Sequence, residues 1–246
     1  MAAMTKVNSK WYAEWFNTKY YHILYKDRDY EEAQLFMQNL VDFLQLDPLA
    51  KVLDLACGKG RHSIYLHQLG FQVTGTDLSK NSIAFAKKHE KPGLEFKIQD
   101  MCKPLSEEFD AVFNLFTSFG YFKDETNNLN TLKAIKAELK PGGYGVIDFM
   151  NAKKVIRELV AEDTKTVNGI KFHQKRWVEN NFIFKQIDFK DDGEYFSFTE
   201  RVKALSLKDF KNYFDQAGIQ LLNVFGDYHL QDFDEETSDR LILIFQ

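Results

Sequence analysis

The sequence predicts an α/β fold, built as a doubly wound sheet of seven mostly parallel strands with the last strand antiparallel. Three observations lead to this prediction. Between residues 52 and 149, five short strand-like segments, the first of them an apolar run, alternate with segments of helical periodicity. The first run leads into a loop with glycines, a connection typical of the strand and helix around a nucleotide pocket. Two more apolar runs near the C-terminus complete the predicted sheet.

The elements follow from periodicity and from signals at their ends. Residues 31–46 carry an apolar stripe at helical spacing, and Pro48 ends that helix. Gly70 caps the first helix after the loop, Ser79 begins the next, and Pro-Gly-Gly at 141–143 forms a turn before the fifth strand. The expected strands are 52–55, 72–76, 95–99, 110–115 and 145–149, and the helices between them are 61–69, 79–89 and 127–139.

From about residue 166 the pattern changes to alternation of apolar and polar residues. Together with turn sequences at 180–181 and 191–193, it predicts a three-stranded antiparallel β insertion over residues 166–202. Because so short a segment is not stable alone, we expect it to pack onto the main sheet. After it we expect a helix over 206–218, with end signals at Ser206, Asp209 and Gly218, and closing strands at 219–225 and 241–245.

The N-terminal segment is unusually aromatic. Residues 11–30 hold two Trp, five Tyr and one Phe without a clean period, which indicates one or two short helices packed over something. Two interpretations stay open at this point: a segment docked by its aromatic side chains, or a lid over a ligand.

Composition narrows the class of protein. Hydrophobic residues make up 44% and charged residues 28%, as in soluble globular proteins, and no apolar run is long enough to span a membrane. A net charge of −4 argues against a broad nucleic-acid surface. Cys57 and Cys102 form neither a disulfide framework nor a metal-ligand pattern, and Cys57 is interpreted as a packing residue. With a polar N-terminus that lacks a signal-peptide core, we expect a reduced, cytoplasmic setting.

The segment 51–63 is the most specific part of the sequence. The first strand carries Asp54 near its end, followed by a loop with Gly58 and Gly60. Glycines let the backbone approach a ligand closely. A buried acid is costly without a partner, and it would repel a pyrophosphate. It suits a cofactor that has an adenosine end and a positively charged amino-acid end.

Later strands end in residues that fit the rest of such a ligand. Asp77 ends the second strand, where a carboxylate can accept hydrogen bonds from both ribose hydroxyls. Asp100 follows the third strand and can accept from the adenine amino group, while Leu78 and Met101 can cover the ring faces. Asn114 ends the fourth strand. Because ligands bind at the carboxyl ends of parallel strands, these residues are expected to meet.

These motifs resemble those of the class I S-adenosylmethionine-dependent methyltransferases. Val52-Leu-Asp-Leu-Ala-Cys-Gly-Lys-Gly-Arg-His looks like their first motif, Val73-Thr-Gly-Thr-Asp-Leu-Ser like the second and Ile98-Gln-Asp-Met like the third. Residues 109–122 resemble the fourth-strand motif, and Leu139-Lys-Pro-Gly-Gly the turn before the fifth strand. The resemblance is clear over residues 50–150. One departure is Ala56, where the family often has Gly; we expect a mild change if the position does not need a positive φ.

The resemblance implies a Rossmann-like sheet, an S-adenosylmethionine cofactor and no metal. It places the loop after the first strand at the methionine portion, with Arg61 as a partner for the cofactor carboxylate and Asn114 near the sulfonium. The cofactor-binding residues are expected to be Asp54, Ala56, Cys57, Gly58, Gly60, Arg61, Asp77, Leu78, Asp100, Met101 and Asn114.

The catalytic residues are not predicted by the sequence. An acid–base group is needed only if the acceptor must lose a proton. Tyr20, Tyr21 and His62 are the main candidates, and His22, His173 and Tyr121 are further ones. His62 also suits a capping or packing role on the first turn of its helix.

Taken together, we expect one domain, 1–246, that transfers a methyl group from S-adenosylmethionine to a small or medium organic acceptor by direct displacement. Its parts are a helical and aromatic cap (1–46), a cofactor-binding core (47–150), a β insertion acting as a substrate lid (165–203) and a C-terminal helix with strands (204–246). Two alternatives stay open: a non-catalytic S-adenosylmethionine-binding regulatory protein, and a nicotinamide-linked oxidoreductase, although Ser63 replaces the third glycine which that class expects. The acceptor atom, the substrate and the oligomeric state are not predicted.

Overall fold

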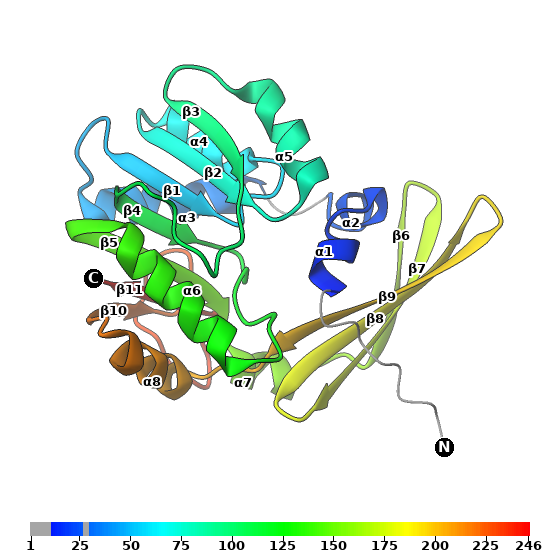
Figure 1. The fold of residues 1–246 in the computed structure, drawn as a ribbon. Coiled ribbons are helices and arrows are strands. Elements are labelled where there is room, and N and C mark those ends of the chain that lie inside the picture. The colour runs from blue at the N-terminus through cyan, green and yellow to red at the C-terminus, as the bar shows by residue number, and fades with distance from the viewer. Residues whose placement is uncertain (1–10, 27–29) are drawn as a thin grey trace.

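The computed structural model describes residues 11–26 and 30–246, and a seven-stranded sheet forms its main body (Figure 1). The strands of this sheet are β1 (Lys51–Leu55), β2 (Gln72–Asp77), β3 (Leu94–Ile98), β4 (Phe109–Asn114), β5 (Leu139–Met150), β10 (Leu221–Phe225) and β11 (Arg240–Phe245). They are ordered β10-β11-β5-β4-β1-β2-β3. The central strands pair in parallel, whereas β11 runs antiparallel to both of its neighbours. The predicted doubly wound sheet with an antiparallel last strand is confirmed.

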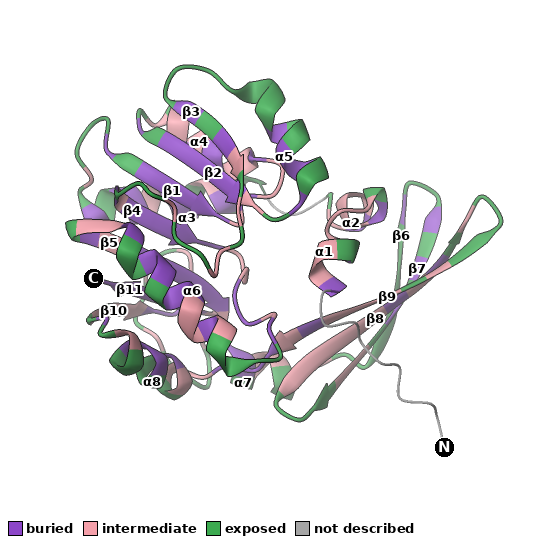
Figure 2. Cartoon of the chain, in the orientation of Figure 1, coloured by how far each residue is buried: buried purple, intermediate pink, exposed green. Residues whose placement is uncertain are grey.

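Helices cover both faces of this sheet and give it two apolar cores. The helices of the chain are α1 (Trp11–Trp15), α2 (Lys19–Leu24), α3 (Tyr30–Leu44), α4 (Arg61–Gln68), α5 (Lys80–Ala86), η1 (Lys87–His89), α6 (Glu125–Glu138), α7 (Ala152–Arg157) and α8 (Leu207–Ala217). Side chains of α3, α4 and α5 pack on one face, and those of α6 and α8 on the other. Figure 2 shows the buried residues concentrated in the strands between these layers. In the described part of the chain, no helix is both long and apolar enough to span a membrane.

Strand order reverses between β1 and β4. From β1 the sheet continues through β2 and β3 on one side, and through β4 and β5 on the other. The loops that follow β1 and β4 therefore diverge to opposite faces and leave a crevice at the carboxyl ends of these strands, where ligands of open α/β sheets bind.

The Pro-Gly-Gly segment at 141–143 differs from its prediction as a turn before the fifth strand, because it lies inside β5. Phe109 pairs with Leu139 but Ala111 pairs with Tyr144, so β5 carries extra residues opposite β4. Gly142 has a φ of +79°, which glycine adopts without steric cost. The strand bulges at this point and then resumes its parallel pairing.

The β insertion has four strands, one more than predicted. They are β6 (Glu162–Val167), β7 (Ile170–Glu179), β8 (Phe182–Asp191) and β9 (Glu194–Lys203), paired antiparallel in chain order. The strand β6 was not predicted because its first five residues, Glu-Asp-Thr-Lys-Thr, are polar and exposed. Without an apolar face, a strand has no alternating pattern to detect.

The expectation that the insertion packs onto the main sheet is wrong. Its apolar face is covered by α1 and α2, which lie between the two sheets (Figure 1). Trp15, Tyr20 and Leu24 pack there with Phe172 and Phe189 in a third apolar cluster. The N-terminal helices and the insertion thus share one core, although more than 140 residues separate them in the sequence.

The same N-terminal helices also contact the main body. The side-chain oxygen of Asn17 accepts a hydrogen bond from the Ser79 hydroxyl (2.8 Å) at the start of α5, and the ring of Tyr12 meets that of Phe122. The N-terminal segment therefore bridges the insertion and the carboxyl ends of the sheet.

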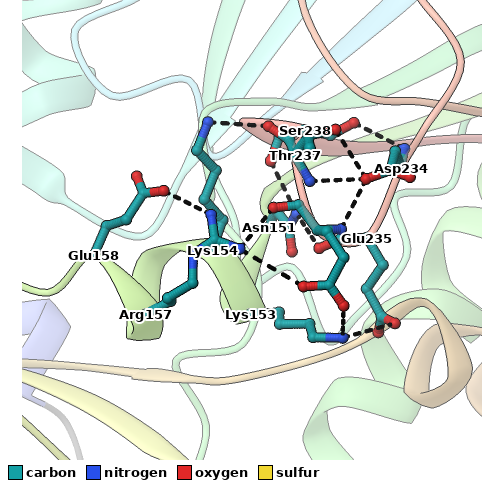
Figure 3. A network of polar contacts seen from close by, with 10 residues as sticks. Asn151, Lys153, Lys154, Arg157, Glu158, Asp234, Glu235, Thr237 and Ser238 are labelled. Carbon is teal, nitrogen blue, oxygen red and sulfur yellow. Dashed lines mark hydrogen bonds and ion pairs between the residues drawn. The ribbon is translucent and has the colours of Figure 1, made fainter.

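The loop between β10 and β11 is fastened onto α7 by a network of polar contacts (Figure 3). The Asn151 amide donates to the carbonyls of Glu235 (2.9 Å) and Ser238 (2.8 Å). The Lys154 ammonium donates to the carbonyl of Thr237 (3.0 Å). These contacts hold the loop against the end of β5, so that Arg240 enters β11 in a fixed position.

Candidate functional site

Two adjoining cavities lie at the carboxyl ends of β1, β2 and β3. The smaller has a volume of about 120 Å³ and the larger about 440 Å³. Tyr21, His22, Ala56 and Gly58 line both of them, so the cavities are parts of one cleft. The cleft is bounded by the sheet on one side and by α1 and α2 on the other.

Asp77 organises the loop after β1. Its carboxylate accepts hydrogen bonds from the backbone N–H groups of Gly58 (2.9 Å) and Ser79 (2.7 Å). Burial raises the pKa of Asp77, and these hydrogen bonds work in the opposite direction. Gly58 has a φ of +58° and open space at the position of a Cβ. The loop backbone is thus held by Asp77 and is accessible from the cleft.

Asp54 lines the larger cavity and is almost fully buried, with 3% of its surface exposed. The Ser63 hydroxyl on α4 donates to its carboxylate at 2.5 Å. Burial raises the pKa of Asp54 to about 6, with a smaller contribution from the charge of Asp77. A carboxylate in this state gains strongly from a cationic partner.

The loop between Asp54 and α4 holds a strained residue and two buried ones. Ala56 has a φ of +66°, so the expectation of a mild change from glycine at this position is wrong. Gly60 caps α4 with a φ of +80°, and an added Cβ would meet the Phe96 ring at 2.4 Å. Gly60 therefore supports close packing and lines neither cavity. Burial raises the pKa of the Cys57 thiol, which fits a packing residue and not a nucleophile.

Replacing Ala56 by glycine is expected to raise the free energy of unfolding. A left-handed conformation costs a non-glycine residue roughly 1–2 kcal/mol, and glycine avoids this cost. Because the unfolded chain of the glycine variant is more flexible, about 0.4–1 kcal/mol of the gain is offset. A net gain of roughly 0.5–1 kcal/mol should appear in urea denaturation. As a control, Ala134→Gly in the middle of α6 should lower the free energy of unfolding by about as much. A destabilised Ala56→Gly variant would contradict the prediction.

The smaller cavity collects the residues predicted at the ends of β2 and β3. Leu78, Asp100 and Met101 all line it. The hydroxyl of Thr76 and the side-chain oxygen of Gln99 are buried there without a hydrogen-bond partner. These two residues were not predicted from the sequence as part of the site. Neither were the aromatic residues Tyr12, Phe16 and Phe122, which line the same cavity.

Asn114 lies deeper than expected. Its side chain is fully buried, and its amide donates to the carbonyl of Leu55 (3.1 Å), which joins the ends of β4 and β1. It lines neither of the two cavities. Its position therefore supports the strand ends, while its side-chain oxygen is buried without a partner.

The two candidate tyrosines of α2 point in different directions. Tyr21 lines both cavities, whereas the Tyr20 hydroxyl donates to Asp191 (2.9 Å) in the turn between β8 and β9. The Tyr20 ring packs on Phe189 and Phe196 of the insertion. Tyr20 is therefore outside the cleft.

His22 and His62 lie at the cleft, but His173 does not. Burial and the nearby charge of Lys59 lower the pKa of His22 to about 4, so the ring is neutral at pH 7. The His62 ring stacks on that of Phe116 at 4.4 Å in the larger cavity. His173 lies on the other side of the insertion beside Thr164.

Arg61 and Tyr121 also lie at the cleft. Arg61 lines the larger cavity and contacts His62, with a nitrogen–nitrogen distance of 3.1 Å. Tyr121 lines both cavities, and its hydroxyl donates to the carbonyl of Thr117 (2.6 Å).

A buried ion pair holds the loop after β4 and was not predicted from the sequence. Asp148 accepts from the Arg240 guanidinium (2.7 Å) and from the backbone N–H of Phe116 (2.7 Å). Arg240 also donates to the Thr117 hydroxyl (3.0 Å). Phe116 and Thr117 have φ values of +58° and +60°, a conformation that a β-branched residue such as Thr rarely adopts. The ion pair therefore stabilises a strained segment that forms a wall of the larger cavity.

The described residues contain no group of three or more His, Cys, Asp or Glu placed to hold a metal ion. The acids at successive strand ends, the glycine loop and the aromatic side chains that line the cleft match a site for an organic cofactor. Comparison with known proteins agrees: a family model for a methyltransferase domain matches residues 46–218. The chain belongs to the class I S-adenosylmethionine-dependent methyltransferases.

Relatives of this methyltransferase extend over most of the chain. YqeM of Bacillus subtilis (strain 168), which is named as a methyltransferase, is 29% identical over 189 residues, covering 72% of this chain and 76% of YqeM. Human glycine N-methyltransferase is 31% identical over 147 residues, covering 52% of this chain and 50% of that protein.

Solved structures share the fold at lower sequence identity. An S-adenosylmethionine-dependent methyltransferase from Clostridium acetobutylicum ATCC 824 has a TM-score of 0.78 at 20% identity, covering 92% of this chain and 95% of that one. A sugar N-methyltransferase from Streptoalloteichus sp ATCC 53650 has a TM-score of 0.72 at 21% identity, covering 92% and 91%. These structures show the shared fold, and membership of the methyltransferase family gives the activity as methyl transfer and the cofactor as S-adenosylmethionine.

Proposed function

We propose that the cleft binds S-adenosylmethionine with its adenosine in the smaller cavity and its amino-acid end at the glycine loop. Asp77 would accept from the ribose hydroxyls, Asp100 would meet the adenine amino group, and Leu78 and Met101 would cover the ring. The single observation that carries this proposal is that the smaller cavity gathers these residues beside the Asp77-bound loop.

The chemistry of the cavity walls fits that cofactor. The unpartnered oxygens of Thr76 and Gln99 offer acceptors on the adenosine side. Asp54 offers a buried carboxylate for the amino group, and Arg61 a guanidinium for the carboxylate. Ala56, Cys57 and Gly58 supply backbone beside the methionine portion. Gly60 and Asn114 act on the site through packing, because they line neither cavity.

The acceptor is proposed to be a small or medium organic molecule in the larger cavity. Its walls come from the loop after β4, from α1 and α2, and from β9 of the insertion, so residues 165–203 with the N-terminal cap act as a lid on the core of residues 47–150. A sugar N-methyltransferase and a glycopeptide N-methyltransferase among the structural relatives are consistent with such an acceptor.

The residues of this chain would act by aligning the cofactor with the acceptor and by excluding water from the cleft. When bound, the cofactor supplies a methyl group already activated on a sulfonium. The aromatic roof of Trp11, Tyr21 and Tyr121 encloses the cleft, and enclosure with correct alignment lowers the barrier of a displacement reaction.

Binding of S-adenosylmethionine should depend on the ionisation of Asp54. The protonated carboxyl cannot pair with the cofactor's amino cation, so affinity should rise with pH through the Asp54 pKa of about 6. One pH unit below this pKa, roughly a tenth of Asp54 is ionised, and affinity should be about tenfold lower than at pH 7.5. Titration calorimetry at pH 5, 6 and 7.5 measures this, and circular dichroism verifies the fold at each pH.

Asp54→Asn is the decisive comparison for that measurement. This variant should bind S-adenosylmethionine weakly at every pH and lose the dependence between pH 5 and 7.5. If the wild-type protein does not bind S-adenosylmethionine at any pH, the proposed site is wrong. If Asp54→Asn retains the pH dependence, another group, such as Asp77, is responsible.

A further inference from the structure

The larger cavity is lined by a carboxylate that comes from the insertion and not from the main sheet. Among the described residues that line it, the acids are Asp54 at the end of β1 and Glu200 on β9. Asp54 belongs to the proposed cofactor site. Glu200 comes from the insertion, so it faces the region that remains for the acceptor.

Glu200 is held in place by the N-terminal helices. The Trp15 indole N–H donates to its carboxylate at 2.7 Å, and the Tyr25 hydroxyl donates at 2.8 Å. Lys185 donates to the Tyr25 hydroxyl oxygen at 2.7 Å, which leaves the hydroxyl hydrogen for Glu200. Two carboxylate oxygens offer about four acceptor positions, so Glu200 keeps capacity for a further donor.

Aromatic rings line the same cavity, and Tyr25, which donates to Glu200, is in ring contact with Tyr21. Trp11, Tyr21, Tyr25, Phe116 and Tyr121 all line it. Ring faces attract cations, and the attraction grows when water is excluded. A fixed carboxylate within an aromatic enclosure is therefore suited to a positively charged or hydrogen-bond-donating nitrogen.

The cations that line this cavity either lie near the glycine loop or bind another side chain. Lys59 and Arg61 belong to the glycine loop and the start of α4, next to the proposed position of the cofactor carboxylate. The Lys26 ammonium donates to the Asn168 side chain at 2.8 Å. The Glu200 carboxylate accepts from two neutral groups, the Trp15 indole and the Tyr25 hydroxyl, while Lys185, its cross-strand neighbour, donates to that hydroxyl.

We propose that the acceptor carries a primary or secondary amine and that Glu200 binds this amine beside the aromatic walls. This inference rests on the proposed function of the larger cavity. The bound ammonium first gives a proton to the Glu200 carboxylate, which frees the nitrogen lone pair. The nitrogen then attacks the methyl carbon, the carbon–sulfur bond breaks, and its electron pair stays on sulfur. The products are an N-methylammonium and a neutral thioether, and the Glu200 proton leaves to solvent.

The test measures charge preference without requiring the natural substrate. Protein loaded with S-adenosylhomocysteine is titrated at pH 7.5 with 3,3-dimethylbutylamine, which is then an ammonium, and with the matching neutral alcohol 3,3-dimethyl-1-butanol. Wild-type protein should bind the amine at least about tenfold more tightly, the value expected for one charge-assisted hydrogen bond of about 1.5 kcal/mol. Glu200→Gln keeps an oxygen that can accept from Trp15 and Tyr25, so the fold should persist while the preference falls to the roughly two- to fivefold that ring contacts of about 0.5–1 kcal/mol supply alone.

Glu194→Gln provides a matched control, because it removes the same charge from the exposed beginning of β9. It should keep the tenfold preference. The inference is overturned if wild-type protein shows no preference for the amine, or if Glu200→Gln keeps the full tenfold preference. Binding of S-adenosylhomocysteine, measured first on each variant, separates these outcomes from a failure of the cofactor site and from misfolding.

Discussion

Asp148→Ala should lower the free energy of unfolding by about 3–5 kcal/mol, because it leaves a buried guanidinium without its partner. The Asp148 side chain is fully buried, and it binds Arg240 at 2.7 Å. The substitution also removes the acceptor for the backbone N–H of Phe116, which holds the strained loop after β4. Urea denaturation followed by circular dichroism measures the loss.

Asp239, which precedes Arg240 in the sequence, provides the control for this prediction. Asp239 pairs with Lys154 at the surface, with 75% of its side chain exposed, and such pairs contribute about 0–1 kcal/mol. Asp239→Ala should therefore change stability little. In a double variant, Asp148→Leu with Arg240→Met, much of the lost stability should return, since no unpaired charge stays buried. Equal effects for Asp148→Ala and Asp239→Ala would refute the account of the ion pair.

Asp77→Ala should weaken binding of S-adenosylmethionine by roughly 100-fold or more. Hydrogen bonds to a charged group contribute about 1.5–3 kcal/mol each, and the substitution would remove those to the ribose. It also releases the backbone N–H of Gly58, so the loop loses its fixed position. Titration calorimetry with S-adenosylmethionine at pH 7.5 measures the change.

Two further variants separate the contributions to that loss. Asp77→Asn keeps an oxygen that can accept from Gly58, so it should bind more tightly than Asp77→Ala and less tightly than wild type. Asp215→Ala removes an acid from the exposed side of α8 and should not alter affinity. An Asp77→Ala protein that binds within threefold of wild type would exclude the ribose role.

The strand ends were predictable because strand-like and helix-like segments alternate between residues 52 and 149. Asp54, Asp77 and Asp100 end or follow short strands, and parallel pairing brings the ends of such strands to one edge of the sheet. The backbone conformation of Ala56 was not predictable in the same way. A sequence pattern gives strand and loop, whereas a positive φ depends on how the finished loop meets its neighbours.

Contacts between distant segments were the hardest to predict. Arg240 and Asp148 meet because β11 pairs antiparallel with β5, where Ile242 lies opposite Asp148 and Arg240 is two residues away on the same face. Nothing local in either strand indicates that register. Tyr20 and Tyr21 could not be distinguished because α2 has only six residues, too few to show which side of the helix faces which neighbour.

The shared core of α1, α2 and the insertion also sets the order in which the protein can be completed during synthesis. Trp15 and Tyr25 are made early, but their partner Glu200 leaves the ribosome about 175–185 residues later. Domains otherwise tend to fold from the N-terminal end as the chain emerges. These hydrogen bonds of Trp15 and Tyr25 can form only after β9 is made, whereas the strands β1 to β5 are made earlier, so the cofactor half can assemble before the wall with Glu200 closes the acceptor side.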